Sequence, residues 1–188
     1  MYQILYINGP SSVGKTTLIK ALQEALDEPF LHLGIDRMIA MMPEKMNNWE
    51  GESAPLGFAF QKSVDETGAV VQKVVIGPFA MKVVKAHKEL VRCLASLGHF
   101  VIIDDVSFGK EQVDQWKKAL KDYRVLWIGL DAPLATLEAR ELQRNNRMLG
   151  SAREQKAKVH TDVTYDLFFD TSTTSLKDCV KAIIHKIV

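Results

Sequence analysis

Hydrophobic and polar positions divide the chain into two kinds of segment that take turns along its length. Five apolar runs of a few residues each end in polar or turn-forming residues, which is typical of buried strands. These runs are Gln3–Asn8, Phe30–Ile35, Phe100–Ile103, Arg124–Gly129 and Leu167–Phe169. The pattern therefore predicts five short strands with longer segments between them.

The longer segments place apolar residues three and four positions apart, as on one face of a helix. In the first of them, Leu18, Leu22 and Leu26 share such a face. Pro78 and Gly98 suit the start and the end of the longest helix. The predicted helices are Lys15–Leu26, a short helix from Asp36 that stops at Pro43, Pro78–Leu97, Gln112–Leu120, Pro133–Arg144, Ala152–Val159 and a last helix from Leu176.

Strands separated by helices predict an α/β fold with right-handed βαβ units, in which helices cover both faces of a five-stranded parallel sheet. No internal repeat or linker divides the chain, so we expect residues 1–188 to form a single domain. Residues 44–72 break the alternation, and Gly51, Pro55 and Gly68 there favour loops or a hairpin. We expect that segment to be an insertion in the domain.

Composition fits one soluble globular domain and argues against some partners. Of 188 residues, 47% are apolar and 25% are charged. Lysine and arginine number 24 against 23 acidic residues, and this near-neutral balance favours neither nucleic acid nor an anionic membrane as a partner. Cys93 and Cys179 suit no disulfide framework, and the chain starts without a signal-peptide pattern, so we expect a cytoplasmic protein. No apolar run approaches the roughly 18 residues of a membrane span.

The first predicted strand runs directly into Gly9-Pro-Ser-Ser-Val-Gly-Lys-Thr16, a complete G-x-x-x-x-G-K-[ST] motif, and a helix follows it. In such a P-loop the backbone curls so that successive N–H groups point at phosphate oxygens, and the helix N-terminus adds positive partial charge. Lys15 is expected to reach the β- and γ-phosphates, and the Thr16 hydroxyl to bind Mg²⁺. The residues predicted to hold ATP are Gly9, Pro10, Ser11, Ser12, Val13, Gly14, Lys15, Thr16 and Thr17. An ordinary glycine-containing turn is the alternative, and the flanking strand and helix count against it.

Val101-Ile-Ile-Asp104-Asp105 has the form of a Walker B strand, an apolar run that ends in a carboxylate. At the carboxyl end of a strand beside the first one, Asp104 would lie within reach of the magnesium ion. A buried strand followed by a polar turn is the alternative. Asp105 is expected either to hold a water molecule near the metal or to face solvent.

Asp36 closes the second predicted strand, at the edge where α/β folds bind ligands. Its carboxylate can take the proton of an acceptor hydroxyl, or orient that hydroxyl for in-line attack. Asp36 also suits the N-cap of the helix that follows, and the spacing leaves both roles open. Trp49, Phe58 and Phe60 of the insertion either line an apolar acceptor pocket or simply pack the insertion.

Arg140, Arg144 and Arg147 form a basic group, and the first two share one helix face. We expect a lid at residues 140–152, from which these arginines would bind nucleotide phosphate, with Arg140 and Arg144 assisting phosphoryl transfer. The alternative is a solvated basic helix face paired with acidic neighbours on the same helix, Glu138 and Glu141. The five histidines have no metal or triad spacing, and we expect them to be structural.

Several segments, spread in order over almost the whole chain, resemble the chloramphenicol phosphotransferases. They are Ile7–Thr16, Leu33–Asp36, Met42–Met46, Ile102–Val106, Val125–Gly129 and Asp162–Asp166. The resemblance implies a P-loop fold of the nucleoside-monophosphate-kinase type and ATP-dependent phosphorylation of a hydroxyl on a chloramphenicol-like small molecule. It also implies that Asp36 is the general base. The expected partners are ATP, Mg²⁺ and a small-molecule hydroxyl acceptor, with the oligomeric state left open.

Three other hypotheses stay open. In the first, the protein is a kinase with a different acceptor, which is a nucleotide, a sugar nucleotide as in toxin-like kinases, or another small metabolite. A GTP switch is the second, but the Asn-Lys-x-Asp run of guanine-reading switches does not occur in the chain. The third is a nucleotide-binding module without catalysis, against which Lys15, Thr16, Asp36 and Asp104 argue.

Overall fold

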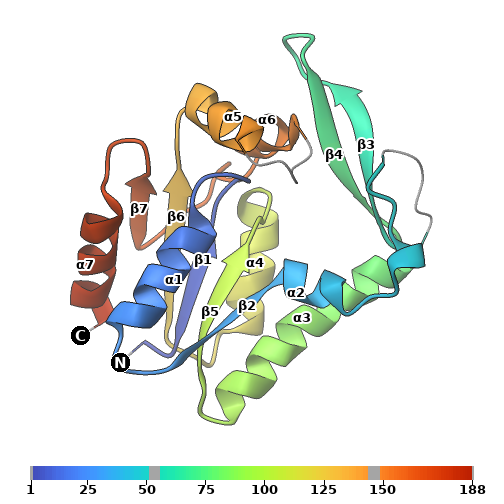
Figure 1. The fold of residues 1–188 in the computed structure, drawn as a ribbon. Helices are drawn as coiled ribbons and strands as arrows, with labels where there is room; N and C mark the ends of the chain where they lie inside the picture. The colour runs from blue at the N-terminus through green and yellow to red at the C-terminus, as the bar shows by residue number, and fades with distance from the viewer. Residues whose placement is uncertain (1, 51–55, 144–148, 188) are drawn as a thin grey trace.

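The computed structural model describes residues 2–50, 56–143 and 149–187 of the 188-residue chain. Its main sheet has five parallel strands in the order β2-β5-β1-β6-β7, which confirms the predicted fold class (Figure 1). The strands are β1 (Ile4–Asn8), β2 (Phe30–Gly34), β5 (Phe100–Asp105), β6 (Val125–Asp131) and β7 (Leu167–Asp170).

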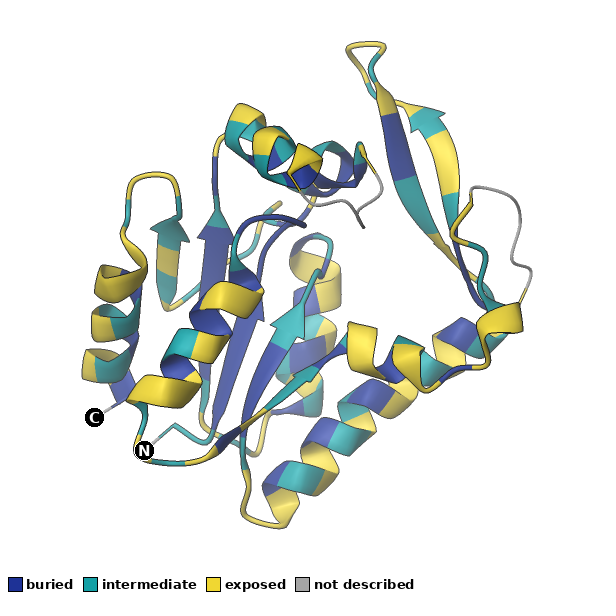
Figure 2. Cartoon of the chain, in the orientation of Figure 1, coloured by how far each residue is buried: buried dark blue, intermediate teal, exposed yellow. Residues whose placement is uncertain are grey.

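Helices pack on both faces of this sheet because its central strands are apolar on both sides. On one face lie α1 (Lys15–Ala25) and α7 (Leu176–Ile187), and on the other lie α3 (Pro78–Ser96) and α4 (Gly109–Ala119). Successive side chains of β1 alternate between the faces: Leu5 and Ile7 pack with α1 and α7, whereas Ile4 and Tyr6 pack with α3 and α4. Figure 2 shows the result, with β1 buried along its length and the helices buried on one side only. A strand buried on both faces reads as a continuous apolar run.

Four shorter helical elements complete this part of the fold. They are α2 (Ile35–Ala40), the 3-10 helix η1 (Glu44–Met46), α5 (Leu134–Leu142) and α6 (Ser151–Lys156). The helix predicted to reach Arg144 is described as far as Leu142, and Arg144 lies outside the described residues. Within the described ranges, no helix combines the length and the apolar character that a membrane crossing requires.

The insertion leads into an antiparallel hairpin that extends past residue 72. It consists of β3 (Phe58–Val64) and β4 (Val70–Ile76), and it projects away from the main sheet (Figure 1). Asp65 closes the turn, since its carboxylate accepts hydrogen bonds from the backbone N–H groups of Thr67 and Ala69. The hydroxyl of Thr67 also donates to this carboxylate and is the main reason why the pKa of Asp65 falls to about 2.

β5 continues beyond its predicted end at Ile103, so that Asp104 and Asp105 both belong to the strand. The cause is pairing with β1, because Ile7 lies opposite Asp104 and Asn8 lies opposite Asp105. The two neighbouring carboxylates then point to opposite faces of the sheet, as successive residues of a strand do. One faces the loop after β1, and the other faces the core beside α4.

The carboxylate of Asp105 is a structural hub. Its Oδ2 accepts hydrogen bonds from the Tyr6 hydroxyl at 2.8 Å, the Ser107 hydroxyl at 2.5 Å and Nε1 of Trp116 at 2.6 Å. Its Oδ1 accepts one from the backbone N–H of Val106 at 2.9 Å. Burial, and then the charge of Asp105, raises the pKa of Tyr6 well above its usual range, so this hydroxyl remains a donor. The expectation that Asp105 binds water or faces solvent is therefore wrong.

Replacing Asp105 with Ala should destabilise the fold. The hydroxyl of Tyr6 and Nε1 of Trp116 would stay buried without their acceptor, which should lower the free energy of unfolding by about 2–4 kcal/mol. Urea denaturation measures this change. Asp122→Ala, at an exposed position, is the control and should shift the midpoint little. Equal midpoints for the two variants would contradict the role of Asp105.

Candidate active site

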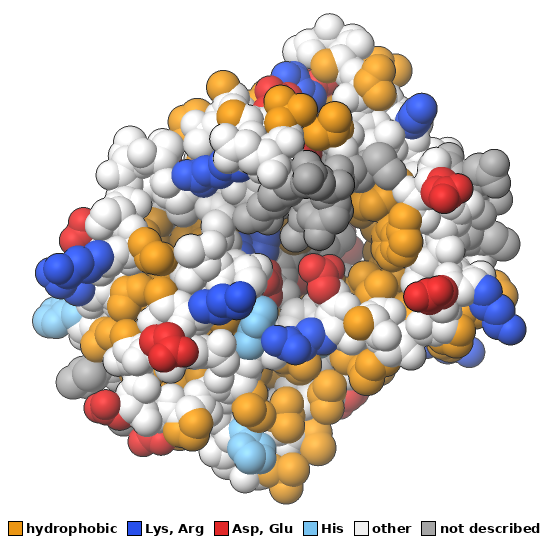
Figure 3. All heavy atoms as spheres, viewed as in Figure 1, with side chains coloured by type: hydrophobic (Ala, Val, Ile, Leu, Met, Phe, Trp, Pro, Cys, Tyr) orange, Lys and Arg blue, Asp and Glu red, His pale blue; other side chains and the backbone are white. Residues whose placement is uncertain are grey.

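Three neighbouring strands end at one edge of the sheet, and each leads to a predicted site residue. β1 runs into the loop at Gly9, β5 carries Asp104, and β2 ends two residues before Asp36. The register brings these ends level, because Gly34 of β2 and Ile7 of β1 both lie opposite Asp104. In the space-filling view the surface is hollowed in the same area, with acidic and basic side chains around the hollow (Figure 3).

The loop after β1 has the shape and the unused polar groups of a phosphate site. A Cβ on Gly9 would lie 2.4 Å from the carbonyl oxygen of Leu130, so only glycine allows this close approach to β6. Ser12 and Gly14 curl the backbone with φ angles of 63° and 106°. The hydroxyls of Ser11 and Ser12 are buried and have no hydrogen-bond partner within the part of the chain that is described. Because buried polar groups need partners, the loop fits an anionic phosphate group.

Lys15 places its positive charge over the start of this loop. Its Nζ donates hydrogen bonds to the carbonyl oxygens of Gly9, at 2.7 Å, and Pro10, at 3.1 Å. The same atom lies 3.9 Å from Oδ1 of Asp104. The side chain is largely buried, so its charge acts at short range on whatever the loop binds.

The other loop residues predicted to bind ATP differ in how far their side chains are exposed. Pro10 and Val13 are buried, whereas Thr16 and Thr17 are exposed on the first turn of α1. Only Thr16 of the two approaches Asp104, with its hydroxyl 3.5 Å from Oδ2. The structure therefore brings together the two residues predicted as magnesium ligands.

The carboxylate of Asp104 is kept ionised by its surroundings. Burial alone would raise the pKa of Asp104, but the neighbouring His32, Lys15 and Thr16 together outweigh burial and hold this pKa below its ordinary value. Mg²⁺ prefers oxygen ligands and usually takes only one or two from the protein, with water and phosphate supplying the rest. The pair of Thr16 and Asp104 fits that pattern. In the described residues, no group of three His, Cys, Asp or Glu side chains forms an all-protein metal site.

His32 and Gly34 also border Asp104, although no local pattern in the sequence singles them out. Nε2 of His32 lies 3.5 Å from Oδ2 of Asp104, so this histidine borders the site, and its expected structural role stays a prediction. A Cβ on Gly34 would lie 3.2 Å from the Cβ of Asp104 and 3.1 Å from its carbonyl oxygen. Both effects arise because β2 is the neighbour of β5, which local patterns do not reveal.

Asp36 lies in the first turn of α2, and its side chain is exposed. The N-cap residue of α2 is Gly34, and no side chain caps that helix. The N-cap alternative for Asp36 is therefore wrong. Its carboxylate makes no hydrogen bond to any residue that the structure describes, which leaves it available to a ligand at the edge of the sheet.

Arg140 is the one predicted lid arginine within the described residues, since Arg144 and Arg147 lie outside them. Its Nη1 donates to the carbonyl oxygen of Val13 at 3.3 Å and to the hydroxyl of Thr171 at 2.9 Å. Its Nη2 donates to the carbonyl oxygen of Thr171 at 3.0 Å. Arg140 is thus fixed beside the P-loop, while its contact with phosphate stays a prediction.

The acidic neighbours of Arg140 have other partners, so the alternative of a solvated face paired with them does not hold for this arginine. Glu138 accepts a hydrogen bond from Arg153 at 2.7 Å. Glu141 is 1% exposed and accepts from the backbone N–H groups of Gly150, at 2.8 Å, and Ala152, at 3.0 Å. Glu141 therefore fixes the start of α6 against α5.

A further contact at the P-loop comes from α6. The backbone N–H of Ser11 donates to Oε1 of Gln155 at 2.6 Å, and both residues are buried. A glutamine in a short polar helix carries no signal of such a role. It becomes visible only when the fold places α6 beside the loop.

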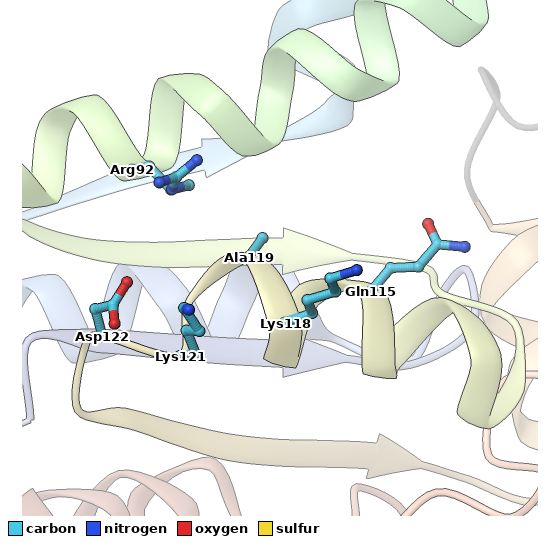
Figure 4. A pocket seen from close by; sticks show the side chains of 6 residues that line it. All are labelled: Arg92, Gln115, Lys118, Ala119, Lys121 and Asp122. Carbon is cyan, nitrogen blue, oxygen red and sulfur yellow. The ribbon is translucent and has the colours of Figure 1, made fainter.

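The outer side of the molecule has a separate groove, between α3 and α4 (Figure 4). Its volume is about 420 Å³. It is lined by Arg92, Gln115, Lys118, Ala119, Lys121 and Asp122. None of the predicted site residues lines this groove, so it is not the candidate active site.

The sequence matches the family described as chloramphenicol phosphotransferase-like protein over residues 2–188. The chain therefore belongs to this family. Proteins of two strains of Mycobacterium tuberculosis, provisionally named O-phosphotransferase, are 27% identical to it over 180 residues, which span 95% of this chain and 79% of each relative.

Solved structures of P-loop kinases share the fold. An APS kinase of Mycobacterium tuberculosis, solved with AMPPNP and APS, has a TM-score of 0.66 at 15% identity, and the match covers 99% of this chain and 97% of that one. A gluconokinase of Sinorhizobium meliloti has a TM-score of 0.60 at 13% identity, covering 97% and 91%. At these identities the likeness concerns the fold alone.

Thr16→Ala and Asp104→Asn should each raise the Mg²⁺ concentration needed for half-maximal activity, while the ATP requirement at saturating Mg²⁺ changes less. Each variant removes one proposed ligand, so we expect roughly a tenfold shift or more, by analogy with the loss of groups that support a metal ion. Magnesium titrations of the activity measure it. Asp122→Asn is the matched control for the charge change, and curves that coincide with wild type would refute the metal assignment.

Proposed function

We propose that this member of the chloramphenicol phosphotransferase-like family is an ATP-dependent kinase that transfers the γ-phosphoryl group of Mg·ATP to a hydroxyl of an uncharged small molecule. The observation that carries the proposal is the convergence of the P-loop, Lys15, Thr16 and Asp104 at one edge of the sheet. The exposed carboxylate of Asp36 lies at the same edge, in the first turn of α2, two residues after the end of β2.

The nucleotide would be held by the backbone N–H groups of the loop and by Lys15, whose ammonium group already lies at the loop's start. Thr16 and Asp104 would hold Mg²⁺, which neutralises negative charge on the β- and γ-phosphates when bound. Arg140 would add positive charge from the side of α5. These groups stabilise charge on the phosphoryl group and keep it in place for in-line attack.

Asp36 would act on the acceptor. A carboxylate that no described residue engages, next to the phosphate site, can accept the proton of an attacking hydroxyl or orient that hydroxyl toward the γ-phosphorus. Phosphate binding and acceptor activation would then belong to different elements. The groups that bind phosphate come from the loop after β1, from α1 and from β5, whereas Asp36 comes from α2.

The acceptor would bind against the apolar region between α2, α3 and the hairpin. Met42, Phe58 and Ala80 are its buried centre. Partly buried side chains packed against them are Ile35, Ile39, Met46, Phe79, Val74, Val83 and Val84. Ile35 directly precedes Asp36, so the apolar region begins beside the proposed base.

Trp49 adds an aromatic surface to this region. Its ring stacks on Phe58 with centroids 6.3 Å apart and tilts against Phe60 at 5.3 Å, while 38% of the residue stays exposed. Exposed aromatic faces beside a polar catalytic group suit a ligand with an apolar or aromatic body. These features support an uncharged, chloramphenicol-like alcohol more than a nucleotide or sugar nucleotide, whose phosphates would need cations in the apolar region.

The proposal is tested by incubating the protein with Mg·ATP and a panel of acceptors. The panel should contain chloramphenicol, other aromatic alcohols, sugars, nucleosides and sugar nucleotides, and mass spectrometry should detect the gain of one phosphate. We expect the gain on aromatic or apolar alcohols. Transfer only to sugar nucleotides would refute the acceptor class, and ATP binding without any transfer would favour a non-catalytic module.

Asp36→Asn should lower kcat by about 10²–10⁴-fold, the usual contribution of a general base, with ATP affinity nearly unchanged. Because Asp36 does not cap α2, the melting temperature should also stay close to wild type. Activity assays, isothermal titration with ATP and thermal melts measure the three quantities. Asp27→Asn, exposed in the connection before β2, is the matched control. A fully active Asp36→Asn enzyme would end the assignment of the base.

A further inference from the structure

Gln155 on α6 is buried against the P-loop through one half of its carboxamide. Its Oε1 accepts the hydrogen bond from the backbone N–H of Ser11 at 2.6 Å, and the residue is 8% exposed. The other half of the group, Nε2, makes no hydrogen bond to any described residue, and this atom is not fully enclosed by protein. Gln155 therefore presents two N–H donors near the loop.

Ser11 lies in the first half of the loop, next to the two residues that Lys15 contacts. Lys15 reaches the β- and γ-phosphates in P-loop enzymes, and here its Nζ contacts the carbonyl oxygens of Gly9 and Pro10. Ser11 follows Pro10 directly, whereas Gly14 and Thr16, at the other end, open α1. The amide of Gln155 thus lies at the end of the loop where Lys15 places its ammonium group, the end that would receive the terminal phosphate.

Contacts with α5 and with the hairpin turn hold α6 in position, so the amide is preorganised. Glu141 binds the backbone at the start of the helix, at Gly150 and Ala152. Arg153 donates to Glu138 of α5 at 2.7 Å and lies 3.3 Å from Asp65 of the hairpin turn. Donors held in place before the reaction stabilise developing phosphoryl charge more effectively than mobile ones.

We propose that Gln155 is a residue of the phosphoryl-transfer site: Oε1 stays on the N–H of Ser11, and Nε2 donates a hydrogen bond to an oxygen of the γ-phosphoryl group. This inference rests on the proposed kinase function and adds to it a neutral donor that recognises the terminal phosphate. Because the donor meets only the γ-phosphate, it distinguishes ATP from ADP.

The alternative is a purely structural role, in which Gln155 only ties α6 to the loop. The substitution Gln155→Glu tests that tie. Gln155→Glu keeps the shape and the acceptor oxygen, and a carboxylate accepts from the Ser11 N–H at least as well as an amide does. The tie would therefore survive. The donor, however, would be replaced by a negative charge facing the phosphate, which weakens binding of the γ-phosphate specifically.

The experiment compares Mg·AMP-PNP and Mg·ADP by isothermal titration, together with kcat and the melting temperature. For Gln155→Glu we expect the preference for AMP-PNP over ADP to fall by about 10- to 100-fold with ADP affinity within about threefold of wild type, as for the loss of a hydrogen bond to a charged group. The kcat should fall as well, and the melting temperature should stay close to wild type. Gln115→Glu, the same change at an exposed site on α4 (Figure 4), is the control and should alter none of these values.

The outcomes separate this inference from the proposed function. A wild-type protein that binds neither nucleotide refutes both. A wild-type kinase whose Gln155→Glu variant keeps its preference and its kcat refutes the role of Gln155 alone, and so does a variant that loses both affinities equally with a lower melting temperature. The near-isosteric and uncharged Gln155→Met separates the lost donor from the added charge. Loss of the preference in this variant too supports the contact, and an unchanged preference overturns it, whether or not Gln155→Glu folds.

Discussion

The meeting of Asp104 with Lys15 and Thr16 is the contact on which the arrangement of the site depends. A partly buried carboxylate is costly unless cations and donors surround it, and here Lys15 and Thr16 of the loop lie beside it, with His32 of β2 next to them. The contact exists because β5 lies between β1 and β2 in parallel register. Strand order thus determines the electrostatics of the edge, and through it where a metal ion and phosphate can be accommodated.

Beneath the loop, a buried polar network holds the end of β1 in place. Nδ2 of Asn8 donates to the hydroxyl of Tyr165 at 2.9 Å and to the carbonyl oxygen of Ser107 at 3.1 Å. His160 contacts the same hydroxyl at 2.9 Å and the carbonyl oxygen of Leu130 at 3.0 Å. Burial lowers the pKa of His160, so the neutral ring donates to Leu130 and accepts from Tyr165. The network links the segment after α6 to the strand that carries the loop.

Local signals in the sequence predicted the elements, and long-range pairing explains what they missed. The strands, the P-loop and Asp104 follow from short apolar runs and a motif with fixed spacing, since those patterns depend on neighbours along the chain. The contacts of His32 with Asp104 and of Gln155 with Ser11 depend on which elements become neighbours in space. The hydrogen bonds of Asp105 escape local patterns for the same reason, because its donors come from β1 and α4 as well as from the residues next to it.

Arg153 joins α6, which touches the P-loop, to the hairpin, which borders the apolar region. Its ion pairs with Glu138 and Asp65 are partly open to water, with about a quarter of the Arg153 side chain exposed. Water and salt weaken such pairs, so they hold a position without locking it. The helix beside the P-loop and the tip of the hairpin are therefore joined through one side chain, by ion pairs whose strength depends on the salt concentration. Ionic strength should therefore act on how firmly the hairpin is held against α6.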